Sequence, residues 1–425
     1  MRRLLVVIVI LILLFVFLAE RVGVFSDAVE EDLQEVIEDN SQEDTAEEVR
    51  DEEHEEFRLG SEVFIEKERY LVEGKKVGLV TNQSGVNSRG ESTIEILREA
   101  DDIELKALYA PEHGIDGLAS AGEYVESYIH EDYGIPVYSL YGATRMPTEE
   151  MLEGLDFLLY DIQDIGARTY TYISTLNYCM KAAAEYGVPV LVLDRPNPLG
   201  GEIVDGPVLE ERFKSFVGVD ILPKAHGMTV GELARYFNRK IGVDLTVVPM
   251  EGYDRAMLYE DTGLSFVQTS PNIPDLVSVY GYMAVGLGEG TGVYQADQFK
   301  WVGGKGLDAE AYADLLNTAG LKGIEFSPDQ RGEAGGVRLE ITDPYQFNPA
   351  RTGLYVLAYA FSLEDFNVPK SNDTIVMFDK IMGTDQMGEF LEKGLSPQEI
   401  EERFAPGIES FKEKRQEYLM SAYDT

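Results

Sequence analysis

The stretch from Asp156 to Leu193 reads DFLLYDIQDIGARTYTYISTLNYCMKAAAEYGVPVLVL, and it determines the fold class. It opens with an apolar run ending at Asp161, continues with a helical pattern over Ile173–Tyr186 and closes with a second apolar run, Val190–Leu193. Apolar runs without alternation are typical of strands buried on both faces, which occur mainly in parallel sheets. A helix between two such strands therefore predicts an α/β fold with helices covering both faces of the sheet.

The same alternation extends along the chain in both directions. Further strands are predicted at Lys76–Thr81, Leu105–Tyr109, Val137–Leu140 and Asp244–Val248, with helices near 92–100, 148–154 and 229–239. After about residue 272 the pattern becomes Gly-rich and then mainly helical, with one strand at Gly336–Ile341 and helices at Ala309–Asn317, Leu354–Ser362, Met387–Lys393, Pro397–Arg403 and Glu409–Tyr418. The sequence thus predicts a parallel-sheet domain over residues 57–275 and a smaller α+β domain over 276–425.

The N-terminal residues predict export. Arg2 and Arg3 precede an uncharged apolar run, Leu4–Ala19, so residues 1–26 are expected to be a signal peptide or a signal anchor. No convincing small-residue cleavage site follows, which favours the uncleaved anchor. Residues 27–56 contain sixteen acidic residues and one basic residue, and such a run is expected to form a disordered acidic linker. The rest of the chain is therefore expected to be extracytoplasmic.

Composition and missing motifs exclude several classes of function. The net charge of −41 argues against a nucleic-acid partner. Cys179 is the single cysteine, so an internal disulfide and a cysteine-based zinc site are excluded, and four histidines with no zincin spacing indicate no metal site. No phosphate-binding glycine motif follows the first strand, and no G-x-S-x-G motif is present. We therefore expect no cofactor and no serine-hydrolase site.

Polar residues cluster where the predicted strands end. Asn82 follows the strand Lys76–Thr81, and Glu112 and His113 follow Leu105–Tyr109. The strand that begins at Asp156 ends at Asp161 and is followed by Gln163, Asp164 and Arg168. Arg195 and Asn197 follow Val190–Leu193. Because the carboxyl ends of parallel strands share one edge of the sheet, these side chains are expected to form one site. Taken alone, some of these residues could have a purely structural role. Asp164 could cap the following helix, and His226 could simply precede the start of a helix.

This set of residues favours carboxylate chemistry. Glycoside hydrolysis needs a proton donor at the leaving oxygen and usually a second group on the other face of the sugar. Glu112 beside His113, at a strand end, fits the donor, and its candidate partners are Glu123, Asp161, Asp164 and Glu289. From the residues alone, the interpretation stops at a carboxylate-dependent hydrolase.

Several longer sequence motifs resemble those of a known protein family. GLVTNQSGV (78–86), LYAPEHGIDG (108–117), DIQDIGARTYTYISTL (161–176), VLDRPNPLGG (192–201) and HGMTVGELA (226–234) occur in this order, and GVRLEITD (336–343) follows. The set resembles the NamZ-type exo-β-N-acetylmuramidase family, exported peptidoglycan glycosidases. The resemblance implies a Rossmann-like domain with a smaller C-terminal domain. It also implies removal of a terminal N-acetylmuramic acid from wall-derived sugars or muropeptides.

The resemblance also assigns roles to residues. The PEHG glutamate of the family, its catalytic acid/base, matches Glu112, and the neighbouring histidine matches His113. Positions expected to bind substrate match Asn82, Gln163, Arg168, Arg195 and His226, and we add Glu123, Asp164, Asn197 and Glu289 as candidates. Arg168 or Arg195 is expected to meet the lactyl carboxylate of the sugar. Asp161, Glu123 or the acetamido group of the substrate would complete the mechanism.

One segment departs from the family pattern. After Glu289-Gly-Thr the family usually continues with Ser-Glu-Gly-Arg-Gly-Thr, whereas this chain reads GVYQADQFKW over residues 292–301. The change leaves two alternatives to the muramidase reading open: a non-catalytic wall-binding protein, or a glycosidase for another acetamido sugar. Retention of Glu112 and His113 favours an active enzyme. Asp297 or Lys300 could replace the missing charges in part.

Overall fold

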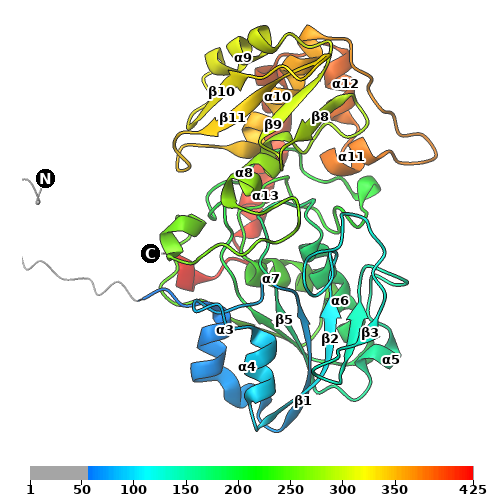
Figure 1. Ribbon diagram of the computed structural model, residues 1–425, viewed down its shortest axis with the longest axis vertical. Helices are drawn as coiled ribbons and strands as arrows, with labels where there is room; N and C mark the ends of the chain where they lie inside the picture. The colour runs from blue at the N-terminus through cyan, green and yellow to red at the C-terminus, as the bar shows by residue number, and fades with distance from the viewer. Residues whose placement is uncertain (1–55, 425) are drawn as a thin grey trace, which may run out of the picture. The chain divides into compact units, whose positions relative to one another are not determined.

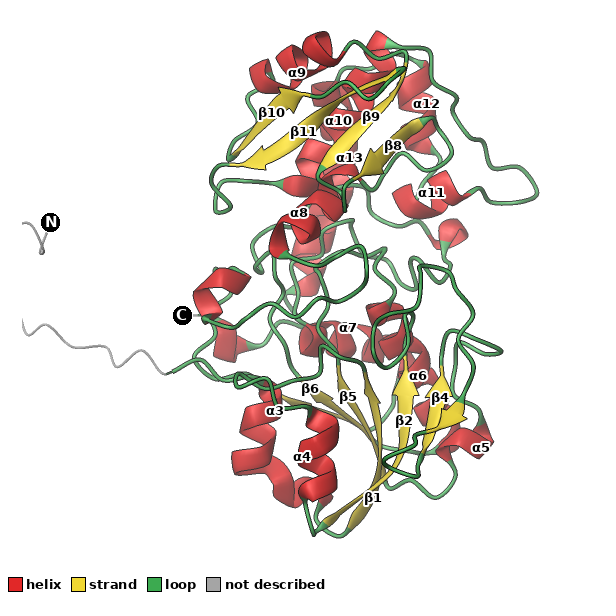
Figure 2. Ribbon diagram, viewed as in Figure 1, coloured by secondary structure: helices red, strands yellow, loops and turns green. Residues whose placement is uncertain are grey.

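A seven-stranded sheet forms the centre of the first domain (Figures 1 and 2). The structure is a computed structural model that describes residues 56–424. Its strands are β1 Lys75–Thr81, β2 Ile103–Ala110, β3 Tyr128–Ile129, β4 Pro136–Ser139, β5 Phe157–Asp161, β6 Val190–Leu193 and β7 Leu245–Val248. They lie in the order β3-β4-β2-β1-β5-β6-β7, and every pair is parallel except β3 with β4. The predicted parallel-sheet, Rossmann-like architecture is confirmed, with a strand-order reversal between β1 and β5.

Both faces of this sheet are buried. The covering helices are α4 Thr93–Glu99, α5 Glu149–Leu152, α6 Tyr172–Tyr186 and α7 Val230–Ile241. Within β5, Leu158 and Tyr160 belong to the core that contains residues of α6 and α7, whereas Leu159 belongs to the core that contains residues of α4. Alternate residues of one strand thus point to opposite apolar layers, which explains why the strands read as continuous apolar runs.

The second domain has its own, antiparallel sheet. Its strands are β8 Val293–Ala296, β9 Trp301–Lys305, β10 Ile324–Pro328 and β11 Ala334–Ile341, in the order β10-β11-β9-β8. Only β11 was predicted. Strand β9 has the sequence WVGGK, which does not look like a strand because it contains two glycines. A Cβ atom at Gly303 would lie 2.3 Å from the Gly335 carbonyl oxygen. Glycine is required there for close strand approach, and it removes the β-rich signature that prediction relies on.

The helices of the second domain are α8 Leu276–Val285, α9 Ala309–Thr318, α10 Pro349–Leu363, α11 Met377–Met382, α12 Gln386–Glu392 and α13 Pro397–Arg415. Helix α8 was not predicted. The prediction of two separate C-terminal helices was wrong, because α13 is one helix that contains Pro406. In Figure 1, α13 runs from the second domain back to the first, where Phe411 packs edge-on against Tyr236 of α7.

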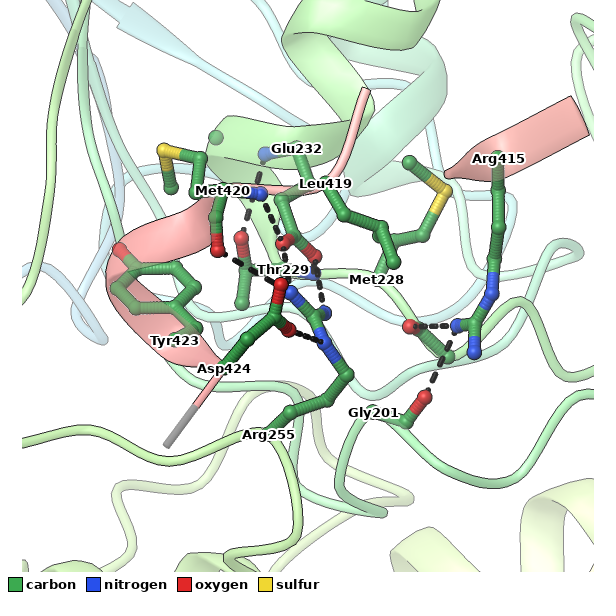
Figure 3. Close-up of polar contacts among 12 residues, drawn as sticks. Gly201, Met228, Thr229, Glu232, Arg255, Arg415, Leu419, Met420, Tyr423 and Asp424 are labelled. Atoms are coloured by element: carbon green, nitrogen blue, oxygen red, sulfur yellow. Dashed lines mark hydrogen bonds and ion pairs between the residues drawn. The ribbon is translucent and has the colours of Figure 1, made fainter. Parts of the chain in front are cut away.

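The end of the chain is fixed to the first domain by a buried acid (Figure 3). Glu232 on α7 is fully buried and accepts hydrogen bonds from both terminal nitrogens of Arg255 and from the Met420 backbone N–H. Arg255 also donates to Asp424. The same acid closes the capping box of α7 with Thr229. One carboxylate therefore holds a helix start, a loop and the C-terminal segment together.

The predicted signal segment, residues 1–26, and the acidic linker up to residue 55 lie outside the described residues. Among the helices of residues 56–424, none has both the length and the apolar character needed to cross a membrane.

The Glu232–Arg255 contact should contribute strongly to stability. We expect Glu232→Ala to lower the free energy of unfolding by about 3–5 kcal/mol, because it leaves a largely buried guanidinium without its main partner. Arg212→Ala, which removes a solvent-exposed ion pair with Asp385, should cost less than about 1 kcal/mol. Urea denaturation followed by tryptophan fluorescence compares the two variants. Equal losses would contradict the assignment.

Candidate active site

Glu112 lies just beyond the carboxyl end of β2 and is held by two donors from two different segments. Its Oε1 accepts from the Gly122 backbone N–H at 3.0 Å, and its Oε2 accepts from the Thr171 hydroxyl at 2.5 Å. Tyr141 lies nearby, and burial together with the Glu112 charge raises the pKa of its hydroxyl group. Thr171 is the N-cap residue of α6, so the carboxylate also lies near a positive helix end. Glu112 is largely buried and retains 9% exposure.

His113 shapes the loop that supplies one of these donors. Its backbone adopts φ of 74°, a region that non-glycine residues rarely occupy. The ring Nδ1 lies 2.7 Å from the Ala119 carbonyl oxygen, and the Ala119 N–H donates back to the His113 carbonyl at 3.1 Å. These contacts fold residues 113–119 into a compact turn before Gly122. A strained, well-held backbone is a feature of functional sites.

Asp161 and Arg195 form a fully buried ion pair. Arg195 Nε lies 2.5 Å from Asp161 Oδ1, and its Nη2 lies 3.0 Å from Oδ2. The Thr93 hydroxyl donates to the same carboxylate, and Arg195 also donates to the Val86 carbonyl. Asp161 has no exposed surface. Its carboxylate is thus engaged by internal donors.

Arg168 is engaged inside the protein as well. Its guanidinium donates to the carbonyl oxygens of Ile381 and Met382 at the C-terminal end of α11. Burial lowers the pKa of Arg168 to about 10. Both arginines predicted for the lactyl carboxylate are buried and have internal acceptors, and of the two only Arg195 lines a cavity.

Asn82 and Gln163 meet at the strand-order reversal. Asn82 Oδ1 accepts from the N–H and the hydroxyl of Ser84, and the Ser84 hydroxyl accepts from the Gln163 N–H at 3.0 Å. Ser84, Gln163, Arg195 and Tyr259 line a cavity of about 170 Å³. Within the described residues, Asn82 Nδ2 and Gln163 Oε1 are buried without a hydrogen-bond partner. The prediction that the ends of β1 and β5 come together is confirmed.

Three further candidates, Asp164, His226 and Asn197, make contacts inside the protein. Asp164 Oδ2 accepts from the Gly166 N–H at 2.8 Å and lies 3.5 Å from His226 Nε2. Asn197 donates to the Met228 carbonyl and accepts from the Leu199 N–H. Asn197 therefore fixes two loops.

The two remaining candidate carboxylates are exposed. Glu123 Oε2 accepts from the Ser120 N–H at 2.8 Å and closes a turn next to Gly122. Glu289 lies on the connection between α8 and β8, and within residues 56–424 no hydrogen bond or ion pair joins it to Glu112. The structure thus places Glu123 in the loop that follows Glu112, whereas Glu289 comes from the second domain.

Sequence reasoning missed a buried lysine. Lys224 is 2% exposed, donates to the Thr169 hydroxyl at 2.7 Å and lies 5.1 Å from the Tyr282 ring centre. Tyr282 comes from α8 of the second domain, and its hydroxyl lies 3.0 Å from Thr169 Oγ1. Burial, with the nearby negative charge of Glu112, raises the pKa of Tyr282 to about 12. No motif around Lys224 signals this, because the contacts join three distant segments.

The divergent segment 292–301 is a regular part of the second sheet. It forms β8 and a turn in which Asp297, Gln298 and Phe299 all have positive φ. Asp297 pairs with Arg331 and Arg338, and Lys300 pairs with Asp275 at the start of α8. The Phe299 ring lies 5.0 Å from that of Tyr282. The segment therefore reaches the site through Phe299, and both charges proposed as replacements are paired within the second domain.

Comparisons with known proteins agree with this architecture. Residues 77–277 match the family model for the N-terminal part of the exo-beta-N-acetylmuramidase NamZ, and residues 280–420 match that for its C-terminal part. The chain belongs to the NamZ family. It is accordingly a glycoside hydrolase, and a NamZ enzyme from Bacillus subtilis, described as a peptidoglycan beta-N-acetylmuramidase, is 41% identical over 85% of this chain and 91% of its own length.

Two crystal structures of DUF1343 family proteins from Bacteroides fragilis share the NamZ-type fold seen here. One has a TM-score of 0.77 at 34% identity and covers 86% of this chain and 99% of its own. The other has a TM-score of 0.65 at 27% identity and covers 87% and 99%.

The buried lysine generates a pH prediction. Burial and the charge of Arg168 hold the pKa of Lys224 well below its ordinary value of 10.5. Between the folded and unfolded pKa values the unfolded chain binds more protons, so stability should rise with pH up to about 10.5. We expect Lys224→Met to be more stable than wild type by about 1–3 kcal/mol at pH 7.

The advantage of Lys224→Met should shrink as the pH rises from 7 to 10, and denaturation at several pH values measures it. Thr169→Val retains the lysine and should retain the wild-type trend. A difference between Lys224→Met and wild type that stays constant over this pH range would contradict the prediction.

Proposed function

We propose that this enzyme removes a non-reducing terminal, β-linked N-acetylmuramic acid from peptidoglycan fragments, with Glu112 as the catalytic acid/base. The observation that carries the proposal is the setting of Glu112, a largely buried carboxyl group fixed by Gly122 and Thr171 at the carboxyl edge of a parallel sheet. Family membership and the Bacillus subtilis relative support the substrate class.

The partners of Glu112 suit a group that gains and loses a proton. A hydroxyl group can donate or accept a hydrogen bond. The Thr171 hydroxyl can therefore donate to the carboxylate, and it can rotate to accept from the protonated acid. The Gly122 N–H fixes the other oxygen throughout. Glu112 can thus protonate the leaving glycosidic oxygen and later receive a proton without moving its heavy atoms.

The group that attacks the anomeric carbon is proposed to be water or part of the substrate, not a side chain of the enzyme. Asp161 is saturated by Arg195 and Thr93, and Glu123 is held by the Ser120 N–H. The proposal therefore leaves attack on the anomeric carbon to water or to the acetamido oxygen of the substrate, as in substrate-assisted glycosidases. Proton magnetic resonance of the first-formed product anomer distinguishes the two routes.

Replacing Glu112 tests the acid. We expect Glu112→Gln to lower turnover of a chromogenic β-N-acetylmuramide by about 10²–10⁴-fold, because the amide cannot transfer the proton. Glu123→Gln, a carboxylate of the same loop region, should stay within about threefold of wild type. Circular dichroism and melting temperature control for folding. Turnover near wild type in folded Glu112→Gln would refute the assignment, and no turnover in wild type would favour the binding-protein alternative.

We further infer that the N-terminal segment exports the enzyme and tethers it to the membrane, since residues 1–26 carry the signal pattern and the proposed substrate is extracytoplasmic. Residues 1–56 fused to a reporter that needs a disulfide bond should give an active reporter, because such bonds form outside the cytoplasm. Replacing Leu4–Ala19 with a polar sequence should abolish reporter activity. Equal activity of the two fusions would contradict export by this segment.

A further inference from the structure

We propose that Arg145 binds the carboxylate of the terminal sugar and thereby sets the selectivity of the enzyme for an acidic acetamido sugar. This inference rests on the proposed function and names the residue that binds the lactyl carboxylate of the substrate. Arg145 is chosen over Arg168, which donates to backbone carbonyls, and over Arg195, which is already paired with Asp161.

Arg145 is exposed, yet two aromatic rings orient it. Its guanidinium carbon lies 4.8 Å from the Tyr141 ring centre and 4.4 Å from the Phe216 ring centre, and these rings lie 5.8 Å apart. Stacking uses the face of a guanidinium, while its N–H groups point outward from its edge. The edge is the part that binds a carboxylate through two parallel hydrogen bonds.

No acidic partner uses that edge within residues 56–424, where neither an ion pair nor a hydrogen bond involves Arg145. The sequence has 77 acidic against 36 basic residues, so partners for an arginine are abundant. An oriented guanidinium without one is available for an external anion.

Tyr141 joins this arginine to the catalytic acid. The side chain that stacks on Arg145 also lies near Glu112, since burial and the Glu112 charge together raise the pKa of its hydroxyl group. One tyrosine therefore separates the proton donor from the free guanidinium. In N-acetylmuramic acid the lactyl ether is on C3 of the ring, near the anomeric carbon C1. A sugar with its glycosidic oxygen at Glu112 can thus direct its carboxylate to Arg145.

Three chromogenic substrates test the inference: the β-N-acetylmuramide, its lactyl methylamide and the β-N-acetylglucosaminide. We expect Arg145→Gln to lower kcat/KM for the muramide by about 30–100-fold, mainly through KM, because a charge-assisted pair is lost. The preference of the enzyme for the muramide over the methylamide should fall by the same factor. Arg145→Lys, which keeps the charge but loses the planar edge, should give an intermediate loss.

Arg98→Gln is the matched control. Arg98 also stacks on a tyrosine, at 4.4 Å from the Tyr133 ring centre, but lies away from Glu112. It should leave the preference unchanged. A preference that survives Arg145→Gln, or an equal loss on all three substrates, would overturn the inference.

Binding separates this inference from the proposed function. Calorimetry of free N-acetylmuramic acid with Glu112→Gln and with Glu112→Gln/Arg145→Gln needs no turnover. Weaker binding of the double variant, by about 30–100-fold, would support Arg145 even if no substrate is hydrolysed. Equal binding by the two proteins would overturn the inference even if hydrolysis is established.

Discussion

The buried pair of Asp161 and Arg195 is the constraint on which the site depends. Asp161 ends β5, Arg195 follows β6, and their partners Val86 and Thr93 follow β1. Removing two charges from water is costly, and it is tolerated where close geometry and additional hydrogen bonds compensate for the lost hydration. Here the carboxylate accepts from the guanidinium and from a hydroxyl group, and the guanidinium also donates to a carbonyl. The pair can form only when the ends of three strands are in register, so it fixes the edge from which Asn82 and Gln163 project.

A second constraint is that the two domains share the surroundings of the acid. Thr169 of the first domain contacts Tyr282 of the second, and Tyr282 contacts Phe299 of the divergent segment. Substitutions in segment 292–301 therefore act on the site through aromatic packing. The ion pairs of Asp297 and Lys300 stabilise the turn that presents Phe299. This explains how the segment can differ from the family pattern while Glu112 keeps all of its donors.

The sequence predicted what depends on periodicity and strand ends, and it missed what depends on tertiary contacts. The parallel sheet and the meeting of Asn82 with Gln163 follow from apolar runs that end in polar residues. Strand β9 was missed because close approach to Gly335 requires glycine at position 303. The sequence predicted that Arg168 or Arg195 binds a substrate anion. It could not show that Arg168 donates to buried backbone carbonyls and that Arg195 pairs with Asp161. The sequence did not predict a binding role for Arg145, because its aromatic neighbours Tyr141 and Phe216 come from separate segments.

The strong negative charge of the chain makes the local arrangement around Glu112 decisive. An anionic sugar meets a repulsive average field, but at physiological ionic strength charges beyond about 8 Å are largely screened in water. Groups in direct contact are not screened in this way. A guanidinium that rests over the adjacent rings of Tyr141 and Phe216 needs little further ordering to bind, which lowers the entropic cost of the contact. In the proposal above, one oriented arginine near Glu112 outweighs many distant carboxylates, and this is how an acidic enzyme would select an acidic substrate.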